Sequence, residues 1–353
     1  MSKTALTDKF SEIGASIGEY CGAETALSFG NARAEFNVLR TGCAVYDLGW
    51  RSRIIASCKD RVRWLNGMIT NNIRDLQPGQ GNYSFILTPQ GHVQGDLYTY
   101  NRGEYLVLGT ERFQTAGILE RLRKYIIMDK VELEDISDRR TSIGVQGPKS
   151  LQVLGGALAA PEVQPTRIAD FTWNGIGLSI TRMADEHFQS YEVWMASENA
   201  GAVWDVLISA GATPAGMDAL ELFRVAAGIP RFGQDIHDRD LPQETGQEQS
   251  LNFSKGCYIG QEIVERIRAR GAVHRALVGF VVEGNTPDPG TKVSFNEKQV
   301  GEVTSALRVP SGQAERVLAL GILRREAAKP GTQLQVGAAN ATVSSLPFPE
   351  ASS

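Results

Sequence analysis

The stretch Gly81–Gly109, GNYSFILTPQGHVQGDLYTYNRGEYLVLG, decides the fold class. Its segments Gly81–Thr88, His92–Tyr100 and Glu104–Gly109 are rich in β-branched and aromatic residues. Pro89–Gly91 and Asn101–Gly103 supply turn residues between them. Because these connections are too short for a crossover, the three segments predict an antiparallel meander.

Helices flank this meander. Apolar residues recur at helical spacing between Asp60 and Ile69 and again between Phe113 and Ile126. The remaining pattern mixes strands with helices and does not alternate strictly, so it predicts an α+β protein. Further strands are expected near 141–146, 177–182 and 191–196, and further helices after Pro148, as its first residue, and near 199–210 and 217–227. After the turn-rich connection 235–254, short strands from Val273 onward predict a small β-barrel or sandwich.

Composition limits the possible functions. The chain has 353 residues, of which 42% are hydrophobic, so two or three domains are expected. Its 36 basic and 40 acidic residues give a formal charge of -4, and no basic block could neutralise a run of phosphates, so direct nucleic-acid binding is not expected. No signal-like segment and no stretch of about 20 apolar residues occurs, which predicts a cytoplasmic protein without membrane contact.

The four cysteines are Cys21, Cys43, Cys58 and Cys257. They form no CxxC pair and have no nearby histidine pattern, and a reducing compartment disfavours disulfides. Neither a structural zinc site nor a self-contained iron–sulfur cluster is therefore expected, and no metal ligands are assigned.

Cys257 lies in a distinctive segment that precedes a helical pattern. A helical pattern of apolar residues, Ile263, Val264 and Ile267, follows this segment, so a helix is expected to start near Gly260. The motif residues of the segment are Lys255, Gly256, Cys257, Tyr258, Gly260, Gln261 and Glu262. A cation at Lys255 and the positive end of a helix dipole would favour the thiolate of Cys257. The alternative is that Cys257 is a small buried apolar residue.

The complete string Lys255–Glu262, with the pattern K-G-C-Y-x-G-Q-E, resembles the hallmark of the YgfZ family and its mitochondrial iron–sulfur relatives. This resemblance implies a protein that binds tetrahydrofolate and supports assembly or repair of [4Fe–4S] enzymes, among them tRNA-thiolating ones. It also implies that Cys257 is the working residue.

The rest of the chain is similar to the wider aminomethyltransferase superfamily, which includes the glycine-cleavage T protein. This similarity implies a three-lobed cloverleaf with folate at its centre and a C-terminal small β-barrel. The implied lobes are 1–50 plus 140–245, then 51–139, and then 246–353. The similarity is carried, in order, by Thr41–Leu48, Thr70–Asn72, Pro78–Gln80, Asn82–Ser84, Val145–Ser150, Phe223–Pro230, Phe232–Ile236 and Gly301–Ser305.

Tyr83 and Asp96 are candidate folate-binding residues within the meander. If the first turn is centred between Pro89 and Gln90, these two residues face one another across the hairpin, with Cβ atoms roughly 5 Å apart. An aromatic ring beside a carboxylate suits a reduced pterin, which stacks and donates N–H groups. The alternatives are an exposed Asp96 in a bulged strand and a register slip of one residue, which would separate the pair.

The superfamily resemblance assigns further roles. Asp96 matches the second of two adjacent aspartates and is a candidate catalytic acid, although Gly95 replaces its acidic neighbour. Glu192 matches the glutamate that receives the pterin's amino and ring N–H groups. Arg224 matches an arginine that contacts the ligand or orients the acids. For Glu192 and Arg224 alone, a surface ion pair is the alternative.

One segment departs from the transferase pattern. Thr181–Gln189 replaces a glycine-rich stretch that transferases use for folate and the incoming carrier, so transfer from a lipoyl-bound group is not expected. His187 within this segment is expected to be an exposed loop residue and not a base.

Three hypotheses follow. The leading one is a tetrahydrofolate-binding accessory protein for iron–sulfur enzymes, with client enzymes or assembly proteins as partners and no necessary turnover. The second is a folate-dependent aminomethyltransferase, and the third is a non-catalytic interaction module that has kept only the fold.

Overall fold

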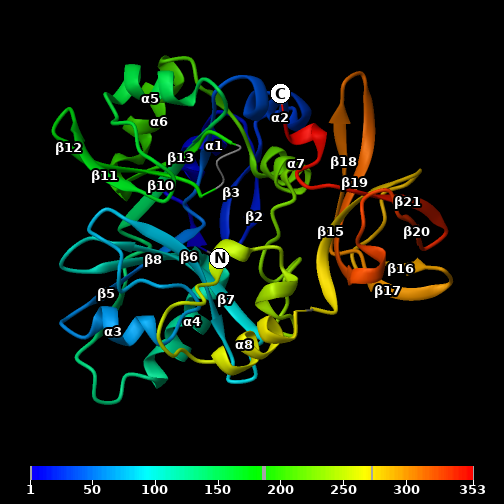
Figure 1. Ribbon diagram of the computed structural model, residues 1–353. Helices are drawn as coiled ribbons and strands as arrows, with labels where there is room; N and C mark the ends of the chain where they lie inside the picture. The colour runs from blue at the N-terminus through cyan, green and yellow to red at the C-terminus, as the bar shows by residue number, and fades with distance from the viewer. Residues whose placement is uncertain (1, 185–187, 272, 353) are drawn as a thin grey trace. The chain divides into compact units, whose positions relative to one another are not determined.

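The computed structural model describes residues 2–184, 188–271 and 273–352, and it contains two compact units (Figure 1). Unit 1 consists of Met1–Ser84 and Leu97–Leu220, and unit 2 of Phe85–Asp96 and Glu221–Ser353. Four β-sheets and eight α-helices occur among the described residues. The predicted α+β class is therefore confirmed. Within the described ranges, none of the helices has the length and apolar character needed to cross a membrane.

A six-stranded sheet forms the largest core of unit 1. Its strand order is β11-β12-β13-β10-β4-β14, and β10 runs antiparallel to both of its neighbours. Helices α5 (Ser150–Leu158) and α6 (Ala200–Ser209) pack against each other, and α6 also packs on β10 (Figure 1). The strands are β4 Ala44–Asp47, β10 Arg140–Gln146, β11 Ile168–Trp173, β12 Ile176–Arg182, β13 Ser190–Ala196 and β14 Thr213–Pro214.

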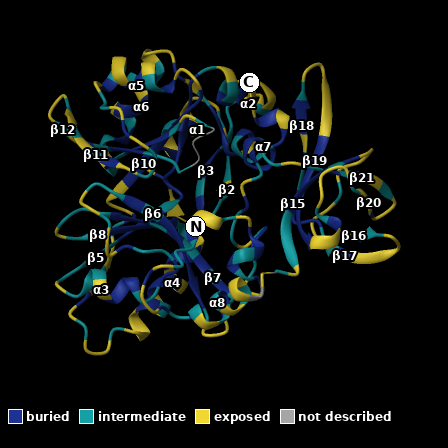
Figure 2. Cartoon of the chain, viewed as in Figure 1, coloured by how far each residue is buried: buried dark blue, intermediate teal, exposed yellow. Residues whose placement is uncertain are grey.

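Apolar side chains from the sheet and from α1 (Thr7–Glu12) fill this core. Ile143 and Val193 are fully buried, and the Phe10 ring meets Trp204 edge-on at a centroid distance of 4.7 Å. Figure 2 shows buried residues concentrated along the strands and exposed ones on loops and outer helix faces. At α5, Lys149 is the N-cap, so Pro148 precedes the helix and is not its first residue as predicted.

A smaller sheet and a capped helix form the N-terminal part of unit 1. The sheet order is β1-β3-β2, with β1 Ser2–Lys3, β2 Ser16–Tyr20 and β3 Ala23–Ser28. Helix α2 (Ala32–Thr41) begins after Asn31, whose side-chain oxygen accepts N–H groups of Arg33 and Ala34. Such a cap satisfies donors that the first helical turn leaves unpaired.

The predicted meander forms most of a five-stranded sheet with the order β6-β7-β8-β5-β9. The chain passes from β4 to β5 through Leu48, Gly49 and Trp50, which joins this sheet to the six-stranded one. Helix α4 (Arg112–Lys124) packs on β5 and β8, and α3 (Arg61–Asn66) follows β5. The strands are β5 Arg51–Ser57, β6 Gly81–Leu87, β7 Val93–Asn101, β8 Leu106–Glu111 and β9 Glu132–Asp135.

The turn between β6 and β7 differs from the predicted one. Thr88 donates its N–H to the His92 carbonyl at 2.9 Å, and Gly91, in the left-handed region with φ +80°, donates to the Thr88 carbonyl at 2.9 Å. The loop therefore has three residues, because left-handed Gly91 adds a bulge. Thr88 therefore pairs with His92 and not with Gly91, as a turn centred between Pro89 and Gln90 would require. The Tyr83 ring packs against Tyr98, with centroids 5.0 Å apart.

Unit 2 is built on a seven-stranded antiparallel sheet with the order β17-β16-β20-β21-β15-β19-β18. Its core includes the fully buried Phe280, Val293 and Leu323, and the predicted C-terminal barrel-like β domain is confirmed. Helices α7 (Met217–Ala227) and α8 (Gln261–Arg270) precede it. The strands are β15 Arg275–Val282, β16 Lys292–Phe295, β17 Lys298–Glu302, β18 Ser305–Ser311, β19 Ala314–Arg324, β20 Gln333–Val336 and β21 Ala339–Ser344.

Gly144 tests the packing of the six-stranded sheet. A Cβ atom at Gly144 would lie 2.0 Å from Cε2 of the buried Tyr46 ring. Gly144→Ala should lower the free energy of unfolding by about 1–3 kcal/mol, because the ring must shift within a packed core. Gly177→Ala on β12, where no atom lies within 4 Å of the added methyl group, is the control. Urea denaturation measures both variants, and equal stabilities would contradict the packing.

Candidate functional site

A buried ion cluster joins the two large sheets of unit 1. Arg51 donates from Nη1 to Oε1 of Glu192, and Arg53 donates from Nη2 to Oε2 at 2.8 Å. The Trp194 indole N–H also donates to Oε2, at 2.9 Å. The side chains of Arg53 and Glu192 are each only 4% exposed, whereas that of Arg51 is 22% exposed. Of these three charged groups, Arg51 is therefore the one that solvent or a ligand can reach.

Strand geometry explains why these side chains meet. Arg51 and Arg53 are two residues apart on β5, and Glu192 and Trp194 are two residues apart on β13, so each pair projects from one face of its strand. Arg53 also donates to the Ser52 carbonyl and to the Ser142 hydroxyl, each at 3.0 Å, which ties it to β10. The arginines of one sheet are thus fixed against the carboxylate of the other.

The electrostatics of the cluster keep Glu192 ionised. Burial alone would raise the pKa of this carboxyl, but Arg51, Arg53 and the Trp194 N–H outweigh burial and hold the pKa below its usual value. Burial lowers the pKa of Arg53, with Glu192 opposing that effect. Because two guanidinium groups face one carboxylate, the cluster carries net positive charge.

Counting hydrogen bonds shows which groups remain available. An ionised carboxylate offers about four acceptor positions, and Glu192 already accepts three N–H groups. It therefore has room for about one more donor, which is fewer than the paired recognition implied by the resemblance requires. Arg53 Nε, in contrast, is buried and has no hydrogen-bond partner among the described residues.

Aromatic rings surround the two guanidinium groups. The Arg53 guanidinium carbon lies 4.3 Å from the Trp194 ring centroid, and that of Arg51 lies 5.9 Å from the Tyr98 ring centroid. Tyr100 meets Trp194 edge-on at 5.2 Å, and Tyr98 lies against Tyr83. Tyr83 and Glu192, both predicted from the sequence, therefore belong to one aromatic and charged neighbourhood of unit 1, which we call the arginine–aromatic cluster (Arg51, Arg53, Tyr83, Tyr98, Tyr100, Glu192 and Trp194).

The other predicted residues belong to unit 2. Asp96 is half-buried on β7 and follows Gly95. Arg224 is 9% exposed on α7 and holds several elements of unit 2 together, since it donates to Glu221, to the Ile229 carbonyl and to Asp235 at 2.6 Å. In this arrangement Arg224 orients the acids Glu221 and Asp235. His187 lies outside the described residues.

Asp235, which the sequence analysis did not single out, is the centre of this second network. It is fully buried and accepts hydrogen bonds from the hydroxyls of Thr304 at 2.6 Å and Ser305 at 2.7 Å, as well as from Arg224. Unit 2 also contains a small hollow of about 210 Å³, which Asp235 lines together with His237, Arg239, Asp240, Arg275, Gln299, Gly301, Glu302, Thr304 and Ile322.

The cysteine segment packs on the hairpin turn of unit 2. Gly260 is the N-cap of α8 with φ +83°, and a Cβ atom there would lie 2.5 Å from the Thr88 carbonyl oxygen. A Cβ atom at Gly91 would likewise lie 2.8 Å from the Cβ of Ile263. Only glycine permits both this backbone conformation and this close approach. The predicted helix start near Gly260 is confirmed.

Cys257 is exposed, three residues before the N-cap of α8. The alternative that Cys257 is a small buried apolar residue is therefore wrong. The buried side chains of this segment are those of Lys255 and Tyr258. Lys255 is 7% exposed, with its ammonium nitrogen 5.0 Å from the Tyr258 ring centroid. Tyr258 is 8% exposed, and its hydroxyl has no hydrogen-bond partner among the described residues.

Sequence reasoning missed Arg51, Arg53 and Trp194. Their signal is the alternation Arg51-Ser-Arg53 at the start of an apolar strand, matched by Glu192-Val-Trp194. Charged residues at every second position of a buried strand indicate partners across a sheet. Nothing in the sequence says that these two strands are those partners.

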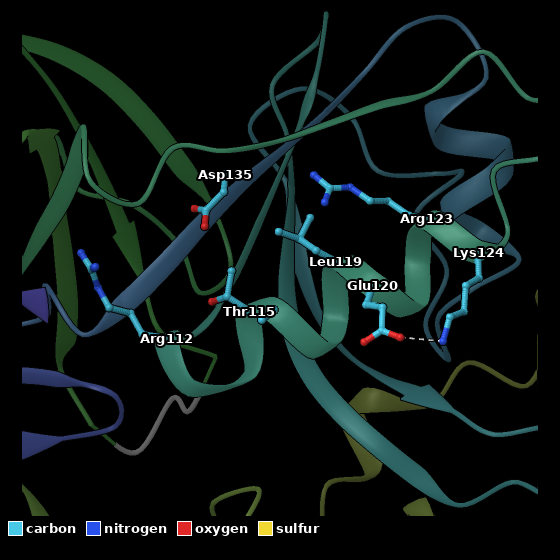
Figure 3. A pocket seen from close by; sticks show the side chains of 8 residues that line it. Arg112, Thr115, Leu119, Glu120, Arg123, Lys124 and Asp135 are labelled. Carbon is cyan, nitrogen blue, oxygen red and sulfur yellow. Dashed lines mark hydrogen bonds and ion pairs between the residues drawn. The ribbon is translucent and has the colours of Figure 1, made fainter. Parts of the chain in front are cut away.

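Unit 1 also contains a hollow, of about 730 Å³, which lies beside α4 (Figure 3). Its basic residues are largely committed to other groups. Lys124 pairs with Glu120 at 2.7 Å, as the dashed line in Figure 3 shows, and Arg112 donates to the Gly49 carbonyl and to Asp138. The arginine–aromatic cluster, which has a buried unsatisfied donor, is the stronger candidate site.

The chain resembles known proteins along nearly its whole length. It is 29% identical over 347 residues to an aminomethyltransferase of Rippkaea orientalis, covering 95% of this chain and 92% of that protein. It is 28% identical to a putative chloroplastic transferase of Arabidopsis thaliana, covering 91% and 74% of the two chains. The crystal structure of aminomethyltransferase T of the glycine cleavage system from Bartonella henselae has the same fold, with a TM-score of 0.88, 20% identity and 99% coverage of both chains.

Two family models match successive parts of the chain. Residues 6–255 match the GCVT N-terminal domain, and residues 275–349 match the glycine cleavage T-protein C-terminal barrel domain. Because the first match alone spans more than half of the sequence, the chain belongs to the GCVT family.

Proposed function

We propose that this protein binds tetrahydrofolate or a one-carbon derivative of it and supports assembly or repair of iron–sulfur enzymes, including tRNA-modifying ones, with Cys257 as its working thiol. The observation that carries the proposal is the exposed Cys257 thiol within the segment Lys255–Glu262, which packs closely on the hairpin turn through Gly260 and Gly91. A thiol presented in this way is accessible to a partner protein or a small molecule.

The arginine–aromatic cluster fits a folate ring system. Tyr83 and Tyr98 offer aromatic faces for stacking, and Arg51 offers donors at the accessible side of the cluster. Tyr83 and Glu192 are the residues of unit 1 that we expect to contribute to binding. The aminomethyltransferases that the chain resembles support this assignment of the ligand class.

The second candidate function is a folate-dependent aminomethyltransferase. The similarity to proteins named aminomethyltransferase over 95% of this chain favours it. Against it stand Gly95, which replaces one of the two adjacent acids of the transferases, and the altered segment Thr181–Gln189. Asp96 would be its catalytic acid.

One experiment separates these functions. Purified protein is titrated with tetrahydrofolate by calorimetry and is then assayed for transfer of an aminomethyl group from a lipoylated carrier. Binding without transfer supports the accessory function, and turnover supports the transferase. The absence of binding would contradict both and would leave an interaction module that has kept only the fold.

Cys257→Ala tests the role of the thiol. We expect unchanged affinity for tetrahydrofolate, since the side chain is exposed and packs against no core, but loss of rescue of [4Fe–4S] enzyme activity in cells that lack the protein. Cys58→Ala, a half-buried cysteine outside the segment, is the control and should rescue fully. Full rescue by Cys257→Ala would overturn the assignment of this thiol.

Glu192 requires a conservative variant. Glu192→Ala would leave two arginines without their carboxylate, which should cost about 3–5 kcal/mol of folding free energy. Glu192→Gln keeps the side-chain volume and removes only the charge, and we expect it to weaken tetrahydrofolate binding by about tenfold with the fold retained.

Calorimetry measures the affinity of Glu192→Gln, and circular dichroism checks its fold. The control is Glu120→Gln, which removes an exposed carboxylate from its pair with Lys124 on α4 and should bind normally. Wild-type affinity in Glu192→Gln would place the ligand elsewhere.

A further inference from the structure

The hydrogen-bond inventory of the arginine–aromatic cluster is unbalanced. Glu192 has about one acceptor position left, because Arg51, Arg53 and Trp194 already donate to it. A guanidinium group carries five N–H donors, and Arg51 uses few of them, donating from Nη1 to Glu192 and, at 4.0 Å, toward the sulfur of Met183. The cluster therefore has more free donors than free acceptors.

The unused donors are costly where they are buried. Arg53 Nε lies out of solvent without a hydrogen-bond partner among the described residues. An unsatisfied donor on a buried charged group is expensive, so a structure that retains one often supplies its partner from water or a ligand. The Arg51 side chain is 22% exposed, so its guanidinium group is the one that such a ligand would contact first.

The surroundings favour a planar ligand over a flexible one. Arg53 lies 4.3 Å from the Trp194 ring centroid, Arg51 lies 5.9 Å from that of Tyr98, and Tyr98 in turn packs on Tyr83. Aromatic walls around a cationic donor suit a flat ring whose edge carries hydrogen-bond acceptors. A flexible carboxylate tail would gain little from these walls.

We infer that Arg51 binds the acceptor edge of the ligand's ring, at the 4-oxo group of the pterin, and that Glu192 acts as a positioning residue that holds the two guanidinium groups. This inference rests on the proposed folate-binding function. It differs from the expectation from family resemblance, in which the carboxylate itself receives the donors of the ring. The site is thereby selective for a ring carbonyl over a ring amine.

A pair of ligands tests the inference without any variant. Tetrahydrofolate carries an oxygen acceptor at ring position 4, whereas reduced aminopterin, its 4-amino analogue, carries an amine donor there. We expect the wild-type protein to bind tetrahydrofolate at least about tenfold more tightly, because a guanidinium donor cannot pair with an amine donor. Equal affinities would overturn the inference while leaving the proposed function intact, and no binding of either ligand would overturn the proposed function itself.

Variants locate the selectivity. In Arg51→Met, which keeps the length of the side chain and loses its donors, the ratio of the two affinities should fall toward one. Arg51→Lys keeps the charge but loses the planar fork, so it should retain an intermediate ratio. Arg123→Met, at an exposed position on α4, is the control and should keep the wild-type ratio.

A third ligand excludes the flexible tail as the group that Arg51 binds. Tetrahydropteroate lacks the glutamate carboxylates but keeps the ring. If the wild-type protein binds tetrahydropteroate much more weakly than tetrahydrofolate but Arg51→Met binds the two equally, Arg51 binds the tail and the inference is wrong. If removal of the tail costs wild type and Arg51→Met equally, the assignment of Arg51 to the ring stands.

Discussion

The ion pairs between Arg51, Arg53 and Glu192 fix the two large sheets of unit 1 against one another. Arg51 and Glu192 are 141 positions apart in sequence, and the side chains of Arg53 and Glu192 are withdrawn from water almost completely. Burying three charged groups is costly unless each finds partners, and here Trp194 and Ser142 supply the additional hydrogen bonds. A close-packed hydrophobic seam could hold the same sheets together, so the retention of charges at this junction points to a use in binding.

In unit 2, two different kinds of contact hold distant segments together. Arg224 and Asp235 connect α7 to the start of β18 through buried polar contacts, and Gly260 sets the cysteine segment directly on the Thr88–Gly91 turn. The first is a network of charged hydrogen bonds, whereas the second depends on the absence of a side chain. Both leave function-bearing groups at defined positions: the acids around Arg224, and the exposed thiol of Cys257.

The candidate site shows how family resemblance and geometry complement each other. The hairpin pattern singled out Tyr83 and the resemblance singled out Glu192, and both lie in the arginine–aromatic cluster of unit 1. Resemblance gave Glu192 the role of acceptor for a ligand, but its acceptor positions are mostly occupied by arginine and indole N–H groups. The chemistry offered to a ligand is therefore set by Arg51 and Arg53, neither of which belongs to the motifs that carry the resemblance.

The sequence by itself determined the α+β class, the meander of Gly81–Gly109, the C-terminal β domain and the helix that starts after Gly260. These features follow from local periodicity and turn residues, which act over a few positions. Tertiary structure alone decided that β5 and β13 bring their charges together and that Cys257 is exposed while Lys255 and Tyr258 are buried. Each of these depends on which distant segments pack together, and a local pattern of residues carries no information about that choice.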